Sequence, residues 1–586
     1  MRMLLAGCVK TVCQSATIFI QSLLKFRTIY REGFPELIIG IFSFSLLAFS
    51  VSAHDWYVVP NGAGTLSGTN WSNATGINNI HWSSMSAGDT VWLAGGTYTS
   101  PLSITQNGVF VKRVLSSDAA PVAAAGWNSA FDSQVVFKIA GAGQDDITIG
   151  ANNVRLDGQI WCGIQCVESN TPTDSKGCVI SSSINNVVAN VEAIGPQYNN
   201  FNGVVFNANA TGFAVVGGTN NLLTNCWSHL NCIDFFQYHD SGVTLDHCLL
   251  SDCGMNAANG GMHSDLIVMQ DAGNLVLRYC VVSNWNQICV QMWSDDATGN
   301  FPTTCGASCY YGNVFINPVG VQDVLWPQGA GQTNVGPLSF YNNTLYRVPV
   351  QRLGRGSVLP WPSGSSASNN IFYGLSCPCW VNAPANEDYE FADSTSSGVA
   401  GSHSISNGSN PFVNAAAFNF NIVSNIGATY PRNRGVPLNN VNGQTYNLDG
   451  NGTIRGADGA WDIGAYEYAS TNASSGSSAQ IFVSPMTINY GPVPAGTTVT
   501  NSFNVQNIGG GTLTGTASVS PPYNVVSGGT YSLASGQTNA VMVSYSPNGS
   551  PTNSTTVNFT ASSGSGTNAI VVGSVLMPPP SGLYIY

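Results

Sequence analysis

Three stretches of the chain repeat one pattern: Asn221-Leu222-Leu223-Thr224-Asn225-Cys226, Val243-Thr244-Leu245-Asp246-His247-Cys248 and Leu275-Val276-Leu277-Arg278-Tyr279-Cys280. In each one a short β-rich run is followed by a turn residue and then by cysteine. Similar runs begin at Gly312, Asn342 and Asn369, so the pattern returns roughly every 20 to 40 residues. Strands that recur at this period predict a solenoid, in which each coil buries its apolar residues against the next coil.

Two of the repeats can be laid over each other almost residue for residue. The stretch Asp234–Gly242 matches Asp265–Gly273, and both continue through a short strand to Cys248 and Cys280. Equivalent residues of adjacent coils lie about 4.8 Å apart. We therefore expect Asp234 and Asp265 to be neighbours, and Cys226, Cys248 and Cys280 to form a buried ladder of free thiols.

The composition limits the classes of partner. The chain has 586 residues, 65 of them glycine, and only 8% are charged, with a net charge of −12. Such a chain offers no basic surface for nucleic acid. With 43% hydrophobic residues it can build a core, so it is expected to fold.

Residues 1–53 differ from the rest. Basic residues precede an apolar run from Leu37 to Phe49, and Val51-Ser52-Ala53 has the small residues of a signal-peptidase site. This pattern predicts a signal peptide, with an N-terminal anchor as the alternative, and an extracellular or cell-surface location.

The ends of the solenoid carry recognisable motifs. Trp56-Tyr57-Val58-Val59-Pro60-Asn61-Gly62, Asp449-Gly450-Asn451-Gly452 and Asp462-Ile463-Gly464-Ala465-Tyr466-Glu467-Tyr468 resemble the first and last segments of pectate-lyase-like proteins. The resemblance implies a right-handed parallel β-helix over residues 54–468. It implies little about the reaction, because this superfamily includes lyases, hydrolases, epimerases and adhesins.

A second domain follows a Ser/Ala/Asn/Gly linker at residues 469–479. Residues 480–576 alternate in short strands and resemble the immunoglobulin-like β-sandwich of the ASH/hydin type, and 577–586 form a tail. No Asp, Glu, Lys, Arg or His follows Glu467, so acid–base catalysis is not expected there. We expect a spacer or adhesion module that associates with the cell envelope.

Residues 229–296 hold four of the seven histidines and many carboxylates. His263 and Asp265 are two apart and share a strand face. Stacked Asp234 and Asp265 would repel each other, which favours an acid with a raised pKa. If the protein is an enzyme, we expect His263 as the base, Asp265 and Asp234 as the acid pair, and Arg278 as the binder of a uronate carboxylate. Trp285, Trp293 and Trp326 are candidate faces for sugar rings.

Each of these residues also has a structural interpretation. Asp234 and Asp265 are alternatively a turn ladder or ligands of a structural Ca²⁺, and no other cofactor is expected. The chain lacks the catalytic patterns of the common β-helix lyases and hydrolases. The sequence therefore predicts a secreted protein that cleaves or binds an extracellular polysaccharide, as a lyase or glycoside hydrolase if catalytic. The alternative is a non-catalytic adhesin or surface stalk, indicated if His263 and Asp265 point into the core.

Overall fold

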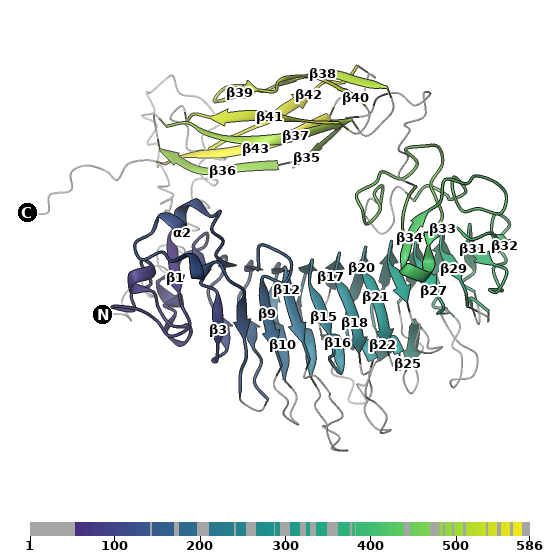
Figure 1. The fold of residues 1–586 in the computed structure, drawn as a ribbon, viewed down its shortest axis with the longest axis horizontal. Coiled ribbons are helices and arrows are strands. Elements are labelled where there is room, and N and C mark those ends of the chain that lie inside the picture. Colours follow the sequence, from purple (N-terminus) through teal and green to yellow (C-terminus); the bar gives the residue numbers. More distant parts are fainter. Residues whose placement is uncertain are drawn as a thin grey trace, which may run out of the picture. The chain divides into compact units, whose positions relative to one another are not determined.

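A computed structural model describes the chain over the following residues: 53–140, 143–168, 175–195, 210–239, 242–253, 265–285, 288–293, 305–316, 324–328, 336–348, 361–375, 378–380, 383–438, 446–468, 479, 481–484, 487–494, 497–507, 511–534, 537–547, 552–562 and 567–576. Within these residues the protein is a right-handed parallel β-helix followed by a small β-sandwich (Figure 1).

Three parallel sheets form the walls of the β-helix, and each full coil passes through sheet 1, sheet 2 and sheet 3 in turn. Sheet 1 contains β1 (Asp55–Val58), β2 (Thr90–Leu93), β5 (Phe110–Arg113), β8 (Arg155–Asp157), β11 (Val187–Ala189), β14 (Asn221–Thr224), β17 (Gly242–Asp246), β20 (Asn274–Arg278), β23 (Ser308–Tyr311), β26 (Leu338–Tyr341), β28 (Ser366–Ser368) and β30 (Asn386–Asp388).

Sheet 2 follows sheet 1 in each coil. It contains β3 (Gly96–Tyr98), β6 (Val135–Phe137), β9 (Ile164–Val167), β12 (Val191–Ile194), β15 (Trp227–His229), β18 (Leu249–Cys253), β21 (Val281–Trp285), β24 (Val314–Ile316), β27 (Thr344–Tyr346), β29 (Ile371–Tyr373), β31 (Phe391–Asp393) and β32 (Ile405–Gly408).

Sheet 3 completes the coil over the first two thirds of the solenoid. It contains β4 (Leu102–Ile104), β7 (Ile147–Ile149), β10 (Lys176–Ile184), β13 (Thr211–Thr219), β16 (Ile233–Tyr238), β19 (Asp265–Gln270), β22 (Ile288–Trp293) and β25 (Leu325–Gln328). Its interior carries large apolar side chains such as Phe213, Phe235 and Ile267, which are at most 2% exposed.

The repeated motif forms the turn from sheet 1 to sheet 2. Asn225, His247 and Tyr279 occupy its left-handed position, with φ of 51°, 53° and 56°. The next residues, Cys226, Cys248 and Cys280, point inward and are at most 3% exposed, which confirms the predicted cysteine ladder. Cys226, Cys248 and Cys280 are free thiols.

Asparagine replaces cysteine in the later coils. Asn313, Asn343 and Asn370 are fully buried, and each amide oxygen accepts a bond from a backbone N–H of the preceding coil, at 2.9 or 3.0 Å. Their Nδ2 groups donate to Leu277, Tyr310 and Phe340 carbonyls. This ladder satisfies backbone groups that the tight turn would otherwise leave buried without partners.

Residues 446–468, here called the closing segment, pack on the outside of the turn from sheet 1 to sheet 2. Ile463 and Ala465 join an apolar cluster with Val314, Ile316 and Tyr346. Asn342 donates to the Asp462 and Gly464 carbonyls, and a β-carbon at Gly464 would lie 2.5 Å from Ile371 Cδ1. Gly464 also has a φ of 110°, a backbone conformation that favours glycine, and this explains the glycine of the Asp462–Tyr468 motif. A hairpin, β33 (Phe412–Asn414) and β34 (Asn419–Ile422), precedes this segment and contains the 3₁₀ turn η5 (Ala415–Ala417).

The β-sandwich has its own core, including Phe503, Val541 and Tyr545. One sheet has the order β35 (Ile481–Ser484), β37 (Val499–Asn507), β41 (Thr538–Tyr545) and β39 (Tyr523–Ser527). The other has the order β36 (Thr487–Pro494), β43 (Thr567–Leu576), β42 (Thr552–Phe559), β38 (Thr512–Ser518) and β40 (Thr530–Ala534).

Helical structure is sparse in the described chain: α2 (Ala119–Ala123), η1 (Trp71–Asn73), η2 (Ile77–Asn79), η3 (Trp82–Ser84) and η4 (Ser129–Phe131), besides η5. None of the helices among the described residues has the length and apolar character needed to span a bilayer.

Candidate functional site

The two strands of the predicted acid pair are neighbours, but their register differs from the prediction. Strands β16 and β19 lie side by side in sheet 3, with Phe235 opposite Ile267. Asp234 is therefore level with Leu266, and the match of Asp234 to Asp265 is wrong by one residue. The observed register keeps Phe235 and Ile267 together in the core, whereas a slip of one residue would turn every side chain to the opposite face.

Asp234 lies in the interior corner between sheets 2 and 3. It is 0% exposed and accepts bonds from Ser228 Oγ at 2.8 Å and Asn231 Nδ2 at 3.4 Å. Burial raises the pKa of its carboxyl well above the ordinary value. Gly212 holds the equivalent place on β13, where a β-carbon would lie 2.0 Å from Ser228 Oγ.

Asp265 is also 0% exposed, at the start of β19 and level with Ile288 of β22. Burial raises the pKa of the Cys253 thiol, and the nearby charges of Asp234, Cys232 and Asp265 raise it further. His263, the predicted base, lies outside the described residues. The structure thus places both aspartates in closed surroundings.

Arg278 lies on a different sheet from these aspartates. It is on β20 of sheet 1, opposite Asp246 of β17 as expected, and its guanidinium donates to Asp246 Oδ2 at 2.8 Å. Burial acts to raise the pKa of Asp246, but bonds from His247 and Arg278 hold it below the ordinary value. Arg278 is therefore bound to a carboxylate of its own chain.

Of the three predicted sugar-stacking tryptophans, Trp285 is a core residue, only 1% exposed on β21. The expectation that its face is open to a sugar is therefore wrong. The side chains of Trp293 and Trp326 lie outside the described part of the structure.

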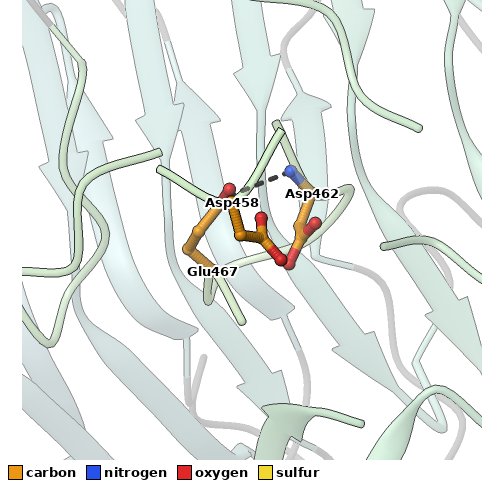
Figure 2. A group of neighbouring side chains, drawn as sticks. All are labelled: Asp458, Asp462 and Glu467. Carbon is orange, nitrogen blue, oxygen red and sulfur yellow. Dashed lines mark hydrogen bonds between the residues drawn. The ribbon is translucent and has the colours of Figure 1, made fainter. Parts of the chain in front are cut away.

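Three carboxylates meet in the closing segment: Asp458, Asp462 and Glu467 (Figure 2). Asp462 accepts backbone bonds from Asn433 and Tyr468, and Glu467 accepts them from Gly456 and Asp462. Asp458 accepts from Arg432 Nε at 2.8 Å. Burial and mutual repulsion raise the pKa of Glu467 to about 8, and burial raises that of Asp462 to about 6. The hydrogen bonds of these carboxylates tie the closing segment to Arg432 and Asn433.

A group of aromatic and polar side chains lies on the outer face of sheet 2, and we call it the ring patch: Gln165, Glu192, Trp161, Trp227 and His229. Gln165 on β9, Glu192 on β12 and Trp227 on β15 are aligned across three adjacent strands. Trp227 and His229 are two residues apart, so both face outward from β15 while Ser228 points inward and is 0% exposed.

The loop before β9 brings Trp161 into the ring patch. The turn from β8 to β9 contains six residues, Gly158–Gly163, where the repeated motif has two. Gln159 and Cys162 take left-handed backbone conformations, and Gln134 Nε2 donates to the Cys162 carbonyl at 2.8 Å. These contacts hold the loop in place while Trp161 remains 49% exposed.

The rings of the patch are stacked. The Trp161 and Trp227 centroids are 6.5 Å apart with planes at 21°, and the Trp227 and His229 centroids are 3.9 Å apart at 14°. Trp227 Nε1 donates to Ser251 Oγ at 3.2 Å, which fixes the indole. The result is a row of nearly parallel rings that ends in an exposed indole.

Glu192 orients the histidine at the base of this row. Its Oε1 lies 3.0 Å from His229 Nε2, and its Oε2 accepts from Gln165 Nε2 at 2.8 Å. Burial acts to raise the pKa of Glu192, but His229 and Gln165 hold it below the ordinary value, so the carboxylate is ionised at neutral pH. Cys162 lies beside it, and burial and Glu192 raise the pKa of its thiol to about 12. This cysteine is therefore a protonated thiol, not a nucleophile.

Sequence reasoning included His229 in the histidine-rich stretch but missed Trp161, Glu192 and Trp227. The signal that could have found them is the longer turn Gly158–Gly163, which interrupts the repeat and carries a tryptophan. Insertions in a solenoid fall in loops, where binding residues concentrate.

No protein-family model matches this chain, and no curated protein matches it either. Among solved structures it is similar to pectate lyase Pel9A, with 15% identity over 72% of this chain and 98% of the lyase, at a TM-score of 0.44. It is also similar to the tailspike gp49 of Acinetobacter baumannii bacteriophage Fri1, a capsular polysaccharide depolymerase, with 11% identity over 82% and 81% of the chains and a TM-score of 0.21. A third match, the ASH/PapD-like domain of human CEP192, has 14% identity over 17% of this chain and 87% of that domain, with a TM-score of 0.15.

Proposed function

We propose that this protein is exported and binds an extracellular polysaccharide through the ring patch on sheet 2 of its β-helix. The observation that carries the proposal is the half-exposed Trp161, held nearly parallel to Trp227 beside a histidine that is hydrogen-bonded to Glu192. The apolar N-terminal run and the cleavage-site pattern at Val51–Ala53 support export.

A sugar ring has one apolar face of C–H groups and a polar rim of hydroxyls. An exposed indole offers a flat apolar surface with few rotatable bonds, so little conformational entropy is lost when a sugar stacks on it. The Gly158–Gly163 loop and the Ser251 bond restrain the two indoles before any ligand arrives. Such pre-organisation favours binding because the cost of ordering the site is already met by the fold.

A solenoid suits a polymeric ligand. Adjacent coils repeat at about 4.8 Å, so consecutive strands of sheet 2 present side chains in a row along the long axis. The ring patch spans β9, β12 and β15 in this direction. A polysaccharide chain lying along the sheet could therefore contact several coils.

Catalysis by His263, Asp265 and Asp234, with Arg278 as the carboxylate binder, stays a prediction. The burial of both aspartates and the Arg278–Asp246 pair favour a binding role, as in the adhesin alternative. A binding assay therefore comes first, and the same incubations report both unsaturated products and reducing ends.

The experiment is affinity electrophoresis and calorimetry of the purified protein with a panel of plant and bacterial polysaccharides. For a polymer that binds, Trp161→Ala is expected to lower the affinity about tenfold, equivalent to about 1.4 kcal/mol. Ile160→Ala is the matched control, because Ile160 sits in the same loop and is 47% exposed, close to the 49% of Trp161. Equal affinities for the wild type and Trp161→Ala would place the binding surface elsewhere.

A further inference from the structure

The three carboxylates of the closing segment share one small space. One oxygen of each of Asp458, Asp462 and Glu467 lies within 4.8 Å of an oxygen of the other two. The carboxylates of Asp458 and Asp462 are turned toward each other (Figure 2). The Asp458 side chain is 5% exposed, and Asp462 and Glu467 are 0% and 2% exposed. Three like charges this close and this deeply buried repel one another, so the cluster needs positive charge beside it.

Two guanidinium groups lie beside this cluster, but they do not balance its charge. Arg432 donates to Asp458 Oδ2, and Arg455 lies 3.5 Å from Glu467. A fourth buried carboxylate, Asp449, is 2% exposed and accepts from the backbone N–H of Glu467 at 2.9 Å. Four carboxylates therefore stand against two guanidinium groups, which leaves two negative charges. A divalent cation would balance this difference.

Two oxygen atoms of this region are buried without a hydrogen-bond donor. Asp458 Oδ1 has no partner, although Oδ2 of the same carboxylate is held by Arg432. The amide oxygen of Asn433 has no partner either, and the backbone N–H of Asn433 donates to Asp462 at 2.6 Å. A β-carbon at Gly459 would lie 2.8 Å from this amide oxygen, so the Asn433 side chain packs on the residue after Asp458. Buried oxygens without a partner are costly, and a cation among the carboxylates would satisfy both.

We propose that the closing segment binds one calcium ion through its three clustered carboxylates and the amide oxygen of Asn433. These ligand atoms are all oxygens, which hard cations prefer. Two oxygens bound to one Ca²⁺ at about 2.3–2.6 Å are at most about 5 Å apart, so the spacing within 4.8 Å suits this ion. Mg²⁺ requires shorter bonds and a regular octahedron, which fixed, buried carboxylates satisfy less readily. The proposal does not depend on the polysaccharide-binding function.

The position of this site gives the ion a structural role. Asn433 precedes the closing segment, so a shared ion would hold the two parts of the chain together at the end of the β-helix. Gly459 and Ala460 are exposed, and an ion can enter beside them without opening the core. Arg434, the other basic residue next to Asn433, is also exposed, so water screens its charge. Calcium should therefore stabilise the closing segment.

Calorimetry tests the binding directly. CaCl₂ is titrated into the purified protein after treatment with EDTA, and we expect one calcium ion per chain. Asp458→Asn removes one charge of the site and should weaken the calcium affinity at least tenfold. Asp393→Asn is the matched control, because Asp393 is also buried, at 7% exposed, but is bonded to Thr395 and Ser396 in its own turn. Its calcium affinity should equal that of the wild type.

Hydrogen exchange tests the place and the effect of the ion. Calcium sites of extracellular modules have dissociation constants on the order of 10⁻⁴–10⁻³ M, so about 10 mM CaCl₂ should increase the protection of amides 456–468 at least tenfold. Amides 541–545 of the β-sandwich are the internal control and should not change. Protein in EDTA is the reference state for every measurement on the closing segment, because bound calcium also changes the protonation of Glu467.

Terbium luminescence gives a further readout that does not require an altered ligand. Trp461 lies between Asp458 and Asp462 in the sequence and is 5% exposed, so its indole is placed to sensitise Tb³⁺ bound in the site. Trp461→Phe should remove most of the emission and leave the calorimetric calcium affinity unchanged. This measurement keeps the proposal testable if Asp458→Asn does not fold.

Three results would overturn the proposal. The first is a titration without calcium binding, together with unchanged exchange of amides 456–468 when CaCl₂ is added. The second is a calcium affinity of Asp458→Asn equal to that of the wild type, which would place the ion elsewhere. The third is binding of Mg²⁺ as tight as that of Ca²⁺, which would contradict the choice of calcium.

Discussion

Two regions on the outside of the β-helix each contain a histidine bonded to a carboxylate beside an aromatic ring, but the surroundings of the two pairs differ. In the ring patch, His229 is bonded to Glu192 and stacks on Trp227. In the turn after β17, His247 is bonded to Asp246 at 2.6 Å and its ring lies 5.0 Å from the Tyr279 ring. The second group, Asp246, His247, Arg278 and Tyr279, is called the docking cluster below.

What separates the two regions is the chain that contacts them. The closing segment bonds to the docking cluster, where His247 Nε2 lies 3.2 Å from the Gly450 carbonyl and Tyr279 Oη donates to the Leu448 carbonyl at 3.1 Å. The ring patch ends instead in an indole that is half exposed. A histidine–carboxylate pair beside an aromatic ring therefore identifies a site only when the surrounding chain leaves it open.

The largest expected effect is on the closing segment. Arg455 is 0% exposed in its side chain, pairs with Glu467, and donates to Tyr311 Oη at 2.8 Å and to the Ala465 carbonyl at 2.7 Å. Arg455→Ala should lower the free energy of unfolding by about 3–5 kcal/mol, because it leaves several buried acceptors without their hydrogen-bond donor. Urea unfolding measures the loss.

Arg155→Ala is the matched control for this arginine. Its side chain is 41% exposed and pairs with Asp157, so the expected loss is only about 0–1 kcal/mol. If both variants lose the same stability, the closing segment is not held by its buried arginine.

The next expected effect is a pH dependence of stability, which should have opposite signs in the closing segment and in the ring patch. The pKa of Glu467 is raised to about 8, so the folded state binds its proton more tightly than the unfolded chain. The contribution of Glu467 to the stability of the fold is therefore complete below the ordinary glutamate pKa, and it is lost as the pH rises through 8. We expect a decline of about 4 kcal/mol in the local stability of the closing segment from pH 5 to pH 9.

Hydrogen exchange of amides 456–468 at pH 5, 7 and 9, corrected for intrinsic rates, measures this decline, and Glu467→Gln should flatten it. Glu192 has a lowered pKa, so its contribution is present above the ordinary value and is lost only in acid. A closing segment that becomes more stable between pH 5 and pH 9 contradicts the raised pKa.

The smallest effects are expected when His247 or His229 is replaced by alanine. His247→Ala should cost about 1 kcal/mol of stability, for the bonds to Asp246 and Gly450, and leave glycan affinity unchanged. His229→Ala should reduce glycan affinity about threefold, or about 0.6 kcal/mol, by removing the ring beneath Trp227. Titration calorimetry and urea unfolding of both variants give the comparison, and a reversed pattern would exchange the roles of the two regions.

Much of the fold could be read from local repeats. Cys226, Cys248 and Cys280 recur after a turn residue, and this period is enough to predict stacked coils and a buried thiol ladder, since like residues must stack. The register of β16 on β19 was predicted wrongly, because matching aspartate to aspartate ignored that Phe235 and Ile267 must face the same core.

The candidate site was harder to predict than the fold. The density of carboxylates and histidines in the sequence favoured Asp234 and Asp265 as site residues. Whether a residue is buried, however, depends on which corner of the coil it occupies, and the residues next to it in the sequence do not show this. Trp161 and Trp227 are 66 positions apart in the numbering. They meet only because β9, β12 and β15 are consecutive strands of one sheet.

The amino-acid sequence by itself determined the solenoid, its inward ladder and the uncharged module after Glu467, because each depends on a short pattern and on the spacing of strands. Only the tertiary structure decided which polar side chains are enclosed, which are bonded to the closing segment and which remain open beside an exposed indole. The physical reason is that exposure is a property of the packed coils, in which a residue's surroundings come from strands tens of positions away in the chain.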